Sequence, residues 1–278
     1  MRLAVSNIAW DVSEDEKIAK LLLRHEISAI DIAPGKYFQY PDQASDSDIF
    51  FVKDWWSQRN IQITGMQSLL FGTTGLNVFG SSTSQNDLIK HIASVCRIGA
   101  GIGAKHLVFG SPKNRDRSGL QDDSVQKIAV DVFRAIGDVA ASYGVTVCLE
   151  PNPPCYGANF MTTSLETGDV VRAIAHTNIK MQLDIGALTI NQESAVNVLD
   201  NCAALIGHVH ISEPNLVPIG DLETKHKEIA AAVLKYLPNH TLTIEMLATT
   251  QESHIQSVER AIQVASKFYR DPQEAPKN

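Results

Sequence analysis

Short apolar runs alternate with longer amphipathic segments along most of the chain. The short runs are each about five residues long and rich in β-branched residues, which predicts strands covered on both faces, as in a parallel sheet. The predicted strands span residues 3–9, 29–33, 62–67, 106–109, 146–150, 179–184, 206–211 and 241–245.

The segments between these strands carry apolar residues at helical spacing. In residues 123–143, for example, Val125 and Val132 lie on one apolar stripe, and Gly144 follows where a left-handed residue commonly closes a helix. Ser13 is expected to cap the first helix. The predicted helices span residues 14–24, 48–58, 85–103, 123–143, 164–175, 191–202, 223–237 and 251–269.

Strand and helix alternate at roughly 30–35 residues per unit, which predicts a single (β/α)₈ barrel, the TIM-barrel fold. A doubly wound open sheet is the alternative. Such a sheet normally has a glycine-rich phosphate loop after its first strand, and residues 6–11 contain no glycine. We therefore expect one barrel over residues 1–269, followed by a polar, proline-containing tail over residues 270–278.

Composition and charge narrow the class of partner. The chain has 278 residues, of which 44% are hydrophobic, and this is ordinary for a globular protein with a sizeable core. Its 24 Lys and Arg against 31 Asp and Glu give a net charge of −7. Proteins that bind nucleic acid through its phosphates carry a basic face, so this balance disfavours a nucleic-acid partner.

The sequence also bears on location. The N-terminus has no basic region followed by a long apolar stretch, so no signal peptide is expected. No apolar run approaches the ~18–20 residues of a membrane span. Cys96, Cys148, Cys155 and Cys202 include no C-x-x-C pair, and we expect free thiols in a reducing compartment. Together these features predict a cytoplasmic protein that does not bind membranes.

Ionisable residues end the last four predicted strands: Glu150, Asp184, His210 and Glu245, at intervals of 34, 26 and 35 residues. In a barrel the carboxyl ends of adjacent strands meet, so these side chains would form a ring. Three carboxylates would repel one another there, and one divalent cation removes that cost. The ligand types suit Mn²⁺, Mg²⁺, Co²⁺ or Zn²⁺. A helix cap or loop salt bridge explains any one of them, but four in phase with the barrel favour a metal site.

The residues around these positions resemble a known family. Leu-Glu-Pro-Asn-Pro at Glu150, Leu-Asp-Ile-Gly at Asp184, His-Val-His-Ile-Ser-Glu-Pro at His210 and Ile-Glu at Glu245 are similar to the xylose isomerase-like barrels. The best agreement is with the sugar phosphate isomerase and epimerase branch, which includes ketose 3-epimerases and hydroxypyruvate isomerases. The resemblance, over residues 2–268, implies that the four residues bind one divalent metal. It also implies that the two glutamates move a proton on opposite faces of the sugar through a metal-stabilised enediolate.

Two positions depart from the pattern of that family. Family epimerases usually carry a His three residues after the strand-six aspartate, where this chain has Ala187. They often carry an Arg six residues after the strand-seven His, where this chain has Leu216. Both positions contact sugar in the family, so the resemblance predicts the metal site but argues against a plain free-ketose 3-epimerase.

Several loop residues are candidates for substrate binding. Arg115, beside Lys113 and Arg117, is expected to clamp a carboxylate or phosphate of the substrate, with a solvated loop as the alternative. Other candidates for hydrogen bonds to the substrate are Gln67, Asn152, Tyr156, Asn159, Glu213 and His226.

Two further expectations concern side-chain direction and loop motion. We expect His208 to point away from His210 and to pack between the barrel and its helices. Residues 71–80 combine glycines with aromatic side chains, a composition typical of a lid that excludes water.

The sequence thus predicts a divalent-metal-dependent isomerase or epimerase of a small sugar or sugar derivative, active in carbohydrate metabolism. Glu150 and Glu245 are the expected acid–base pair. One alternative is an endonuclease IV-like phosphodiesterase, which needs extra His ligands for three zinc ions. Another is a non-catalytic sugar-binding barrel with an incomplete metal site. The sequence does not specify the substrate or the physiological metal. It also does not specify the oligomeric state, and a homo-oligomer is one of the states it allows.

Overall fold

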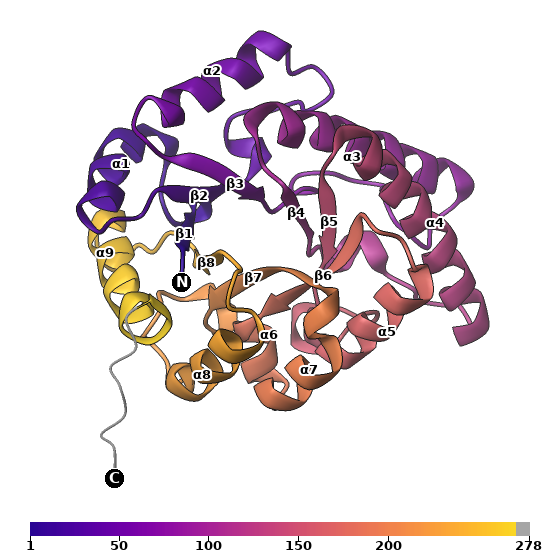
Figure 1. Cartoon of the computed structure of the whole chain (residues 1–278). Helices are drawn as coiled ribbons and strands as arrows, with labels where there is room; N and C mark the ends of the chain where they lie inside the picture. Colours follow the sequence, from indigo (N-terminus) through magenta and orange to yellow (C-terminus); the bar gives the residue numbers. More distant parts are fainter. Residues whose placement is uncertain (271–278) are drawn as a thin grey trace.

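The computed structural model describes residues 1–270 and confirms the barrel. Parallel strands pair in sequence order, and the last strand closes onto the first (Figure 1). The strands are β1 (Leu3–Ser6), β2 (Ala29–Ile32), β3 (Gln62–Met66), β4 (His106–Phe109), β5 (Thr146–Leu149), β6 (Ile179–Asp184), β7 (Ile206–Ser212) and β8 (Leu242–Glu245).

The helices form an outer ring around the barrel (Figure 1). Their apolar stripes face the strands, as in α4, where Val125 and Val132 are buried. Gly144 closes α4 with φ 67°, the left-handed conformation that its position predicted. The helices are α1 (Asp15–Arg24), α2 (Asp46–Ser57), α3 (Ser82–Ile102), α4 (Asp122–Tyr143), α5 (Ser164–Ile174), α6 (Ile185–Ile190), α7 (Ala195–Cys202), α8 (His226–Tyr236) and α9 (His254–Ala265), which continues as a π-helix over Ser266–Arg270.

The start of α1 differs from the prediction. Ser13 does not cap the helix, because it lies inside a 3₁₀ turn, Val12–Glu14, that precedes α1. The Glu14 carboxylate accepts a hydrogen bond from the backbone N–H of Asp11 at 3.2 Å. Asp11, which precedes the turn, is the cap residue, and it forms a capping box with Glu14.

The connection after β6 also differs. The helix that was expected over residues 191–202 begins later, as α7, and a separate short helix, α6, follows β6 directly. Asp184 ends β6 and caps α6, since its Oδ1 accepts a hydrogen bond from the N–H of Ala187 at 2.6 Å. The direct step from strand to helix holds the Asp184 carboxylate at the carboxyl end of the barrel.

The inside of the barrel is unusually polar. Asp31 of β2, Gln182 of β6, His208 of β7 and Thr243 of β8 are all at most 4% exposed. Gly65 of β3 makes room for the acid, because a Cβ at this position would lie 2.7 Å from the Asp31 carboxylate. A column of hydrogen-bonded side chains therefore fills the space between the two ends of the barrel.

Other expectations concern the chain as a whole. In the described part of the chain, no helix has the length and apolar character to cross a membrane. The four cysteines form no disulfide there. Of the expected tail, 270–278, only Arg270 lies within the described residues, where it ends the π-helix.

Candidate metal centre

The four residues predicted as metal ligands come together at the carboxyl end of the barrel. Glu150 follows β5, Asp184 ends β6, His210 lies in β7 and Glu245 ends β8. One ligand atom of each lies within 4.8 Å of those of the others, and none of these residues is more than 9% exposed. Strand register brings them together, because Asp184 pairs with His210 and Ser212 with Glu245.

The imidazole of His210 faces the three carboxylates. Its Nδ1 lies 3.0 Å from Glu245 Oε2, 3.4 Å from Glu150 Oε1 and 4.0 Å from Asp184 Oδ2. Oε1 of Glu150 is buried and has no hydrogen-bond partner. Buried polar atoms are nearly always satisfied, so this oxygen is free to serve as a ligand. Three oxygens and one imidazole nitrogen fit a divalent cation of the type expected.

The electrostatics of the cluster favour the binding of a positive charge. Burial, together with Glu150 and Glu245, raises the pKa of Asp184 to about 7. Burial lowers the pKa of His210, but the charges of Glu245 and Glu150 outweigh it and hold that pKa well above its ordinary value. Both shifts mean that the cluster takes up protons to offset its negative charge. A divalent cation supplies the same compensation.

Neighbouring groups hold the carboxylates in place. Gln67 Nε2 donates a hydrogen bond to Glu245 Oε1 at 2.5 Å, and Asn152 Nδ2 donates to Glu150 Oε2 at 3.2 Å. Ser212 Oγ donates to Asp184 Oδ2 at 2.7 Å. Such outer contacts orient metal ligands and carboxylate bases before a substrate arrives.

A cavity of about 490 Å³ lies above the cluster. This is within the usual range for sites that bind small molecules. Four of the predicted substrate contacts line it, namely Gln67, Asn152, Tyr156 and Glu213. The remaining three, Arg115, Asn159 and His226, do not.

Arg115 lies behind the cavity wall. Its side chain is fully buried, and it donates hydrogen bonds to the carbonyl oxygen of Glu150 and to Oδ1 of Asn152, both at 2.6 Å. Arg115 was expected to reach a substrate anion, but in the structure its guanidinium contacts Glu150 and Asn152 instead. The reason is that the loop after β4 folds inward and turns the guanidinium toward the backbone after β5.

His226 and Asn159 are also removed from the cavity. His226 Nε2 lies 3.1 Å from Glu213 Oε1, and its Nδ1 lies 2.8 Å from the hydroxyl of Tyr269. His226 therefore contacts the cavity wall through Glu213 only. Asn159 bonds to loop atoms, including Asp116 Oδ1 at 2.6 Å.

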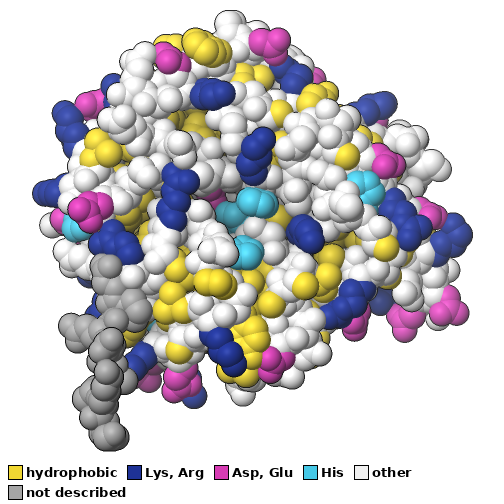
Figure 2. All heavy atoms as spheres, in the orientation of Figure 1, with side chains coloured by type: hydrophobic (Ala, Val, Ile, Leu, Met, Phe, Trp, Pro, Cys, Tyr) yellow, Lys and Arg dark blue, Asp and Glu magenta, His cyan; other side chains and the backbone are white. Residues whose placement is uncertain are grey.

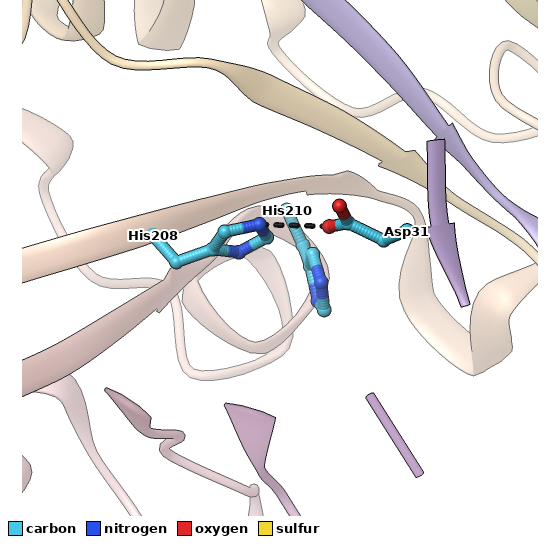
Figure 3. Close-up of side chains that lie close together, drawn as sticks. All are labelled: Asp31, His208 and His210. Atoms are coloured by element: carbon cyan, nitrogen blue, oxygen red, sulfur yellow. Dashed lines mark ion pairs between the residues drawn. The ribbon is translucent and has the colours of Figure 1, made fainter. Parts of the chain in front are cut away.

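The prediction for His208 was wrong. Side chains alternate along a strand, so residues two apart share a face, and His208 points into the barrel with His210 (Figure 3). Their ring centroids are 5.0 Å apart. His208 Nε2 lies 2.8 Å from Oδ2 of Asp31, a dashed contact in Figure 3. Period-two spacing in the sequence was the signal that identifies this inward-facing pair.

Asp31 is a buried carboxylate directly beneath the metal centre. Burial raises its pKa, but the electrostatic attraction of His208 and hydrogen bonds from His208 and Thr243 outweigh burial and lower it to about 2. Oγ1 of Thr243 donates to Asp31 Oδ2 at 2.7 Å. The partners of Asp31 come from β7, β8 and also β3, where Thr64 Oγ1 donates to Asp31 Oδ1 at 3.0 Å. The sequence around Asp31 alone therefore carries no sign that this aspartate is buried and hydrogen-bonded inside the barrel.

The predicted lid divides into two parts. Phe71 is 87% exposed and lines the cavity. Val78 and Phe79 are buried, and the Val78 N–H donates to the carbonyl of Asn114 at 2.8 Å. Any closing movement therefore belongs to the part of the loop around Phe71.

The two departures from the family pattern face the same cavity. Ala187 and Leu216 both line it, along with Leu247 and Phe71. Where the family pattern has His and Arg, this cavity has a methyl and an isobutyl group. This part of the wall offers apolar contact without hydrogen-bond donors from those side chains.

The closed barrel and the acidic centre at the carboxyl ends of its strands define a class of protein. The family model described as xylose isomerase-like TIM barrel matches residues 20–270, and the chain belongs to that family.

Among curated proteins, D-psicose 3-epimerase of Ruminiclostridium cellulolyticum is 28% identical over 103 residues. This match covers 37% of the chain and 33% of that relative. It therefore reaches only a third of the relative's length.

Solved structures share the fold over almost the whole chain. An L-ribulose 3-epimerase has a TM-score of 0.82 at 14% identity, covering 96% of this chain and 94% of that one. D-psicose 3-epimerase with D-tagatose, from Clostridium cellulolyticum H10, has a TM-score of 0.78 at 19% identity, covering 97% and 98%. An IolI protein with a bound zinc atom has a TM-score of 0.74 at 18% identity, covering 97% and 100%.

Proposed function

We propose that this protein is a divalent-metal-dependent isomerase or epimerase of a small sugar or sugar derivative. The observation that carries the proposal is the buried cluster of Glu150, Asp184, His210 and Glu245 at the floor of a cavity. A divalent ion held by these residues would supply the positive charge that stabilises an enediolate oxygen. The ligand set suits Mn²⁺, Mg²⁺, Co²⁺ and Zn²⁺, and the proposal covers each of these metals.

Glu150 and Glu245 are the proposed acid–base pair. Glu150 follows β5 and Glu245 ends β8, two strands that are not neighbours in the closed barrel, and both residues line the cavity. One carboxylate removes the proton beside the substrate carbonyl, and the other returns a proton to the enediolate. The amides of Asn152 and Gln67 hold the two carboxylates in position through one hydrogen bond each.

The cavity walls bear on the class of sugar. Ala187 and Leu216 present apolar groups, and Tyr156 and Phe71 add aromatic surface to the same cavity. Glu213 is the remaining acidic residue of the lining. We therefore propose a sugar derivative with a less polar end toward Ala187 and Leu216, and not a free ketose with hydroxyls along its whole length.

The test is proton exchange with deuterated water, measured by NMR on a panel of ketoses, their phosphates and acidic sugars. Exchange reports enediolate formation even when the natural product is unknown. The Glu245→Gln variant is expected to lose at least about 10³-fold in exchange rate, because a catalytic acid or base typically contributes 10²–10⁴-fold and this residue also binds the metal.

Glu259→Gln is the matched control, because Glu259 lies on α9 and pairs with His25 at 3.0 Å, away from the cavity. This variant should exchange at the wild-type rate. Circular dichroism and metal content are measured on both proteins. Exchange by Glu245→Gln at the wild-type rate contradicts the mechanism. A full metal site without exchange on any sugar favours a sugar-binding barrel, and cleavage of an abasic-site duplex favours the phosphodiesterase.

A further inference from the structure

A second hollow, of about 770 Å³, lies at the opposite end of the barrel, where the strands begin. Figures 1 and 2 view this end, and Figure 2 shows His side chains near its centre, with Lys and Arg side chains around them. The lining comes from the starts of β3 to β7, from α2 and from the segment before β8. His208 lines the hollow from inside the barrel, so the hollow reaches the polar column beneath the metal centre.

Four cations line this hollow: Arg2, Lys53, Lys105 and Lys180. Within residues 1–270, none of them forms an ion pair with a carboxylate, and no acidic side chain lines the hollow. The chain as a whole has a net charge of −7. The local formal charge is therefore opposite in sign to that of the molecule, and no carboxylate of the described residues lies within ion-pair distance of these cations.

The contacts of these cations leave most of their donors available. Arg2 Nη2 donates to the carbonyl of Ser28 at 3.2 Å and to Gln62 Oε1 at 2.9 Å. Lys180 Nζ donates to the carbonyl of Ala204 at 3.4 Å. These partners are neutral, so the hydrogen bonds of Arg2 and Lys180 do not pair their charges with a carboxylate.

Neutral donors accompany the cations. Burial chiefly lowers the pKa of His106 to about 4, so its imidazole is uncharged near neutral pH. His240 Nε2 lies 3.1 Å from the carbonyl oxygen of Ile206, and Thr146 and Thr241 add hydroxyl groups to the wall. A site with hydroxyl and imidazole donors among unpaired cations can surround an anion with both charge and hydrogen bonds.

A simpler explanation accounts for part of this arrangement. The helices of the barrel run opposite to its strands, so their carboxyl ends, which carry partial negative charge, lie at this end. Lys and Arg are favoured near such ends. That explanation covers the sign of the charge, but it does not account for a hollow lined by cations without carboxylate partners.

We propose that this hollow binds a small phosphate-bearing anion with more than one negative charge. Lysines act as point charges toward phosphate and accept several orientations of the ligand. A polyanion offsets several unpaired cations at once, which a singly charged carboxylate cannot do. The cations surround a concave site and do not form a stripe along a surface, which favours a small ligand over a polynucleotide.

The experiment is calorimetric titration of the metal-loaded protein with inorganic pyrophosphate at low and at high salt. The Lys105→Gln/Lys180→Gln variant is expected to bind roughly tenfold more weakly or worse, since a tenfold change corresponds to about 1.4 kcal/mol over two lost charges. Binding should also weaken at high salt, because partly exposed charges are screened.

Two controls localise the binding. Lys127→Gln/Lys227→Gln removes the same charge from α4 and α8, and it should bind pyrophosphate like the wild type. Pyrophosphate can also reach the metal centre, so the Glu245→Gln variant is titrated in parallel and should keep the binding event at the hollow. The proposal is independent of the catalytic one, because Glu245→Gln affects only the other end of the barrel.

Three results overturn the proposal. The first is absence of pyrophosphate binding at millimolar concentration. The second is equal weakening in both double-lysine variants, which indicates a general charge effect. The third is binding of a short single-stranded oligonucleotide without binding of pyrophosphate, which points to a nucleic-acid surface.

Discussion

At the scale of single residues, burial decides what each ionisable group does. The carboxylates of the metal centre share one imidazole, and Asp184 responds with a pKa of about 7. Asp31, only a short distance below, is held ionised by His208 and Thr243. The pKa values of two buried aspartates of the same barrel thus shift in opposite directions, because Asp184 lies among acids and Asp31 beside an imidazole and a hydroxyl donor.

His106 gives a prediction of pH dependence. Its pKa is lowered to about 4 in the folded state, against about 6.5 in the unfolded chain. The folded state therefore favours neutral His106, and this contribution to stability is complete above pH 6.5 and is lost as the pH falls toward 4. The contribution of His106 to the free energy of unfolding changes by at most about 3 kcal/mol over this pH range.

The His106→Gln variant should lose less free energy of unfolding than the wild type between pH 7 and pH 4.5. Urea denaturation at both pH values measures the difference. Other groups titrate equally in the two proteins, so only the difference between them is interpreted. If the free energy of unfolding fell equally with pH in wild type and variant, His106 would not contribute to the pH dependence of stability.

At the scale of elements, short connections fix the ends of the strands that carry the site. β6 passes directly into α6 through Asp184, so the ligand is also the helix cap. The loop after β5 is held from behind by Arg115, which bonds to the Glu150 carbonyl. The site residues therefore rest on tight turns whose backbone has little freedom, as a preorganised site requires.

The turn between α4 and β5 offers a test at this scale. Gly144 has φ 67°, and an Ala there must adopt a left-handed conformation that costs about 1–2 kcal/mol. The Gly144→Ala variant should therefore lower the free energy of unfolding by about 1 kcal/mol. Gly35→Ala is the control, because Gly35 has no left-handed φ and no atom lies within 4 Å of the point that its Cβ would occupy. If Gly144→Ala and the wild type had equal free energies of unfolding in urea, the turn would tolerate a side chain.

At the scale of the whole molecule, the two ends of the barrel differ in charge. The carboxyl ends of the strands hold three buried carboxylates around His210. The amino ends open into the hollow lined by four cations. The buried contact between His208 and Asp31 lies inside the barrel, and His208 also lines the hollow at the amino ends. The same fold thus carries the proposed cation site at one end and the proposed anion site at the other.

Metal binding should be visible in the stability of the whole molecule. A ligand that binds only the folded state at 100 times its Kd adds about 2.7 kcal/mol, which for a chain of this length raises the Tm by roughly 5 °C. Addition of Mn²⁺ to chelator-treated protein is expected to give such a rise in a thermal scan. The Glu150→Gln/Glu245→Gln variant should show none. An equal rise in both proteins would place the stabilising ion elsewhere.

Much of the site could be predicted from the sequence, because the barrel is built from a repeating strand–helix unit. Glu150, Asp184, His210 and Glu245 each end a strand, and their convergence needs only the strand–helix rhythm. Arg115 and His226 could not be placed in the same way. Arg115 bonds to groups 35 and 37 residues away, and His226 packs against Tyr269. Local pattern does not specify such contacts, so these two residues, which were expected to face a substrate, lie behind the cavity wall.

The sequence by itself determined the barrel, the order of its strands and the four groups that meet at their carboxyl ends. These features depend on periods of two and 3.6 residues and on a repeating unit, all of which are local. The tertiary structure decided which side chains line the cavity, how His208 pairs with Asp31, and that unpaired cations surround a hollow at the other end. These depend on contacts between strands and loops far apart in the chain, which form only when the barrel closes.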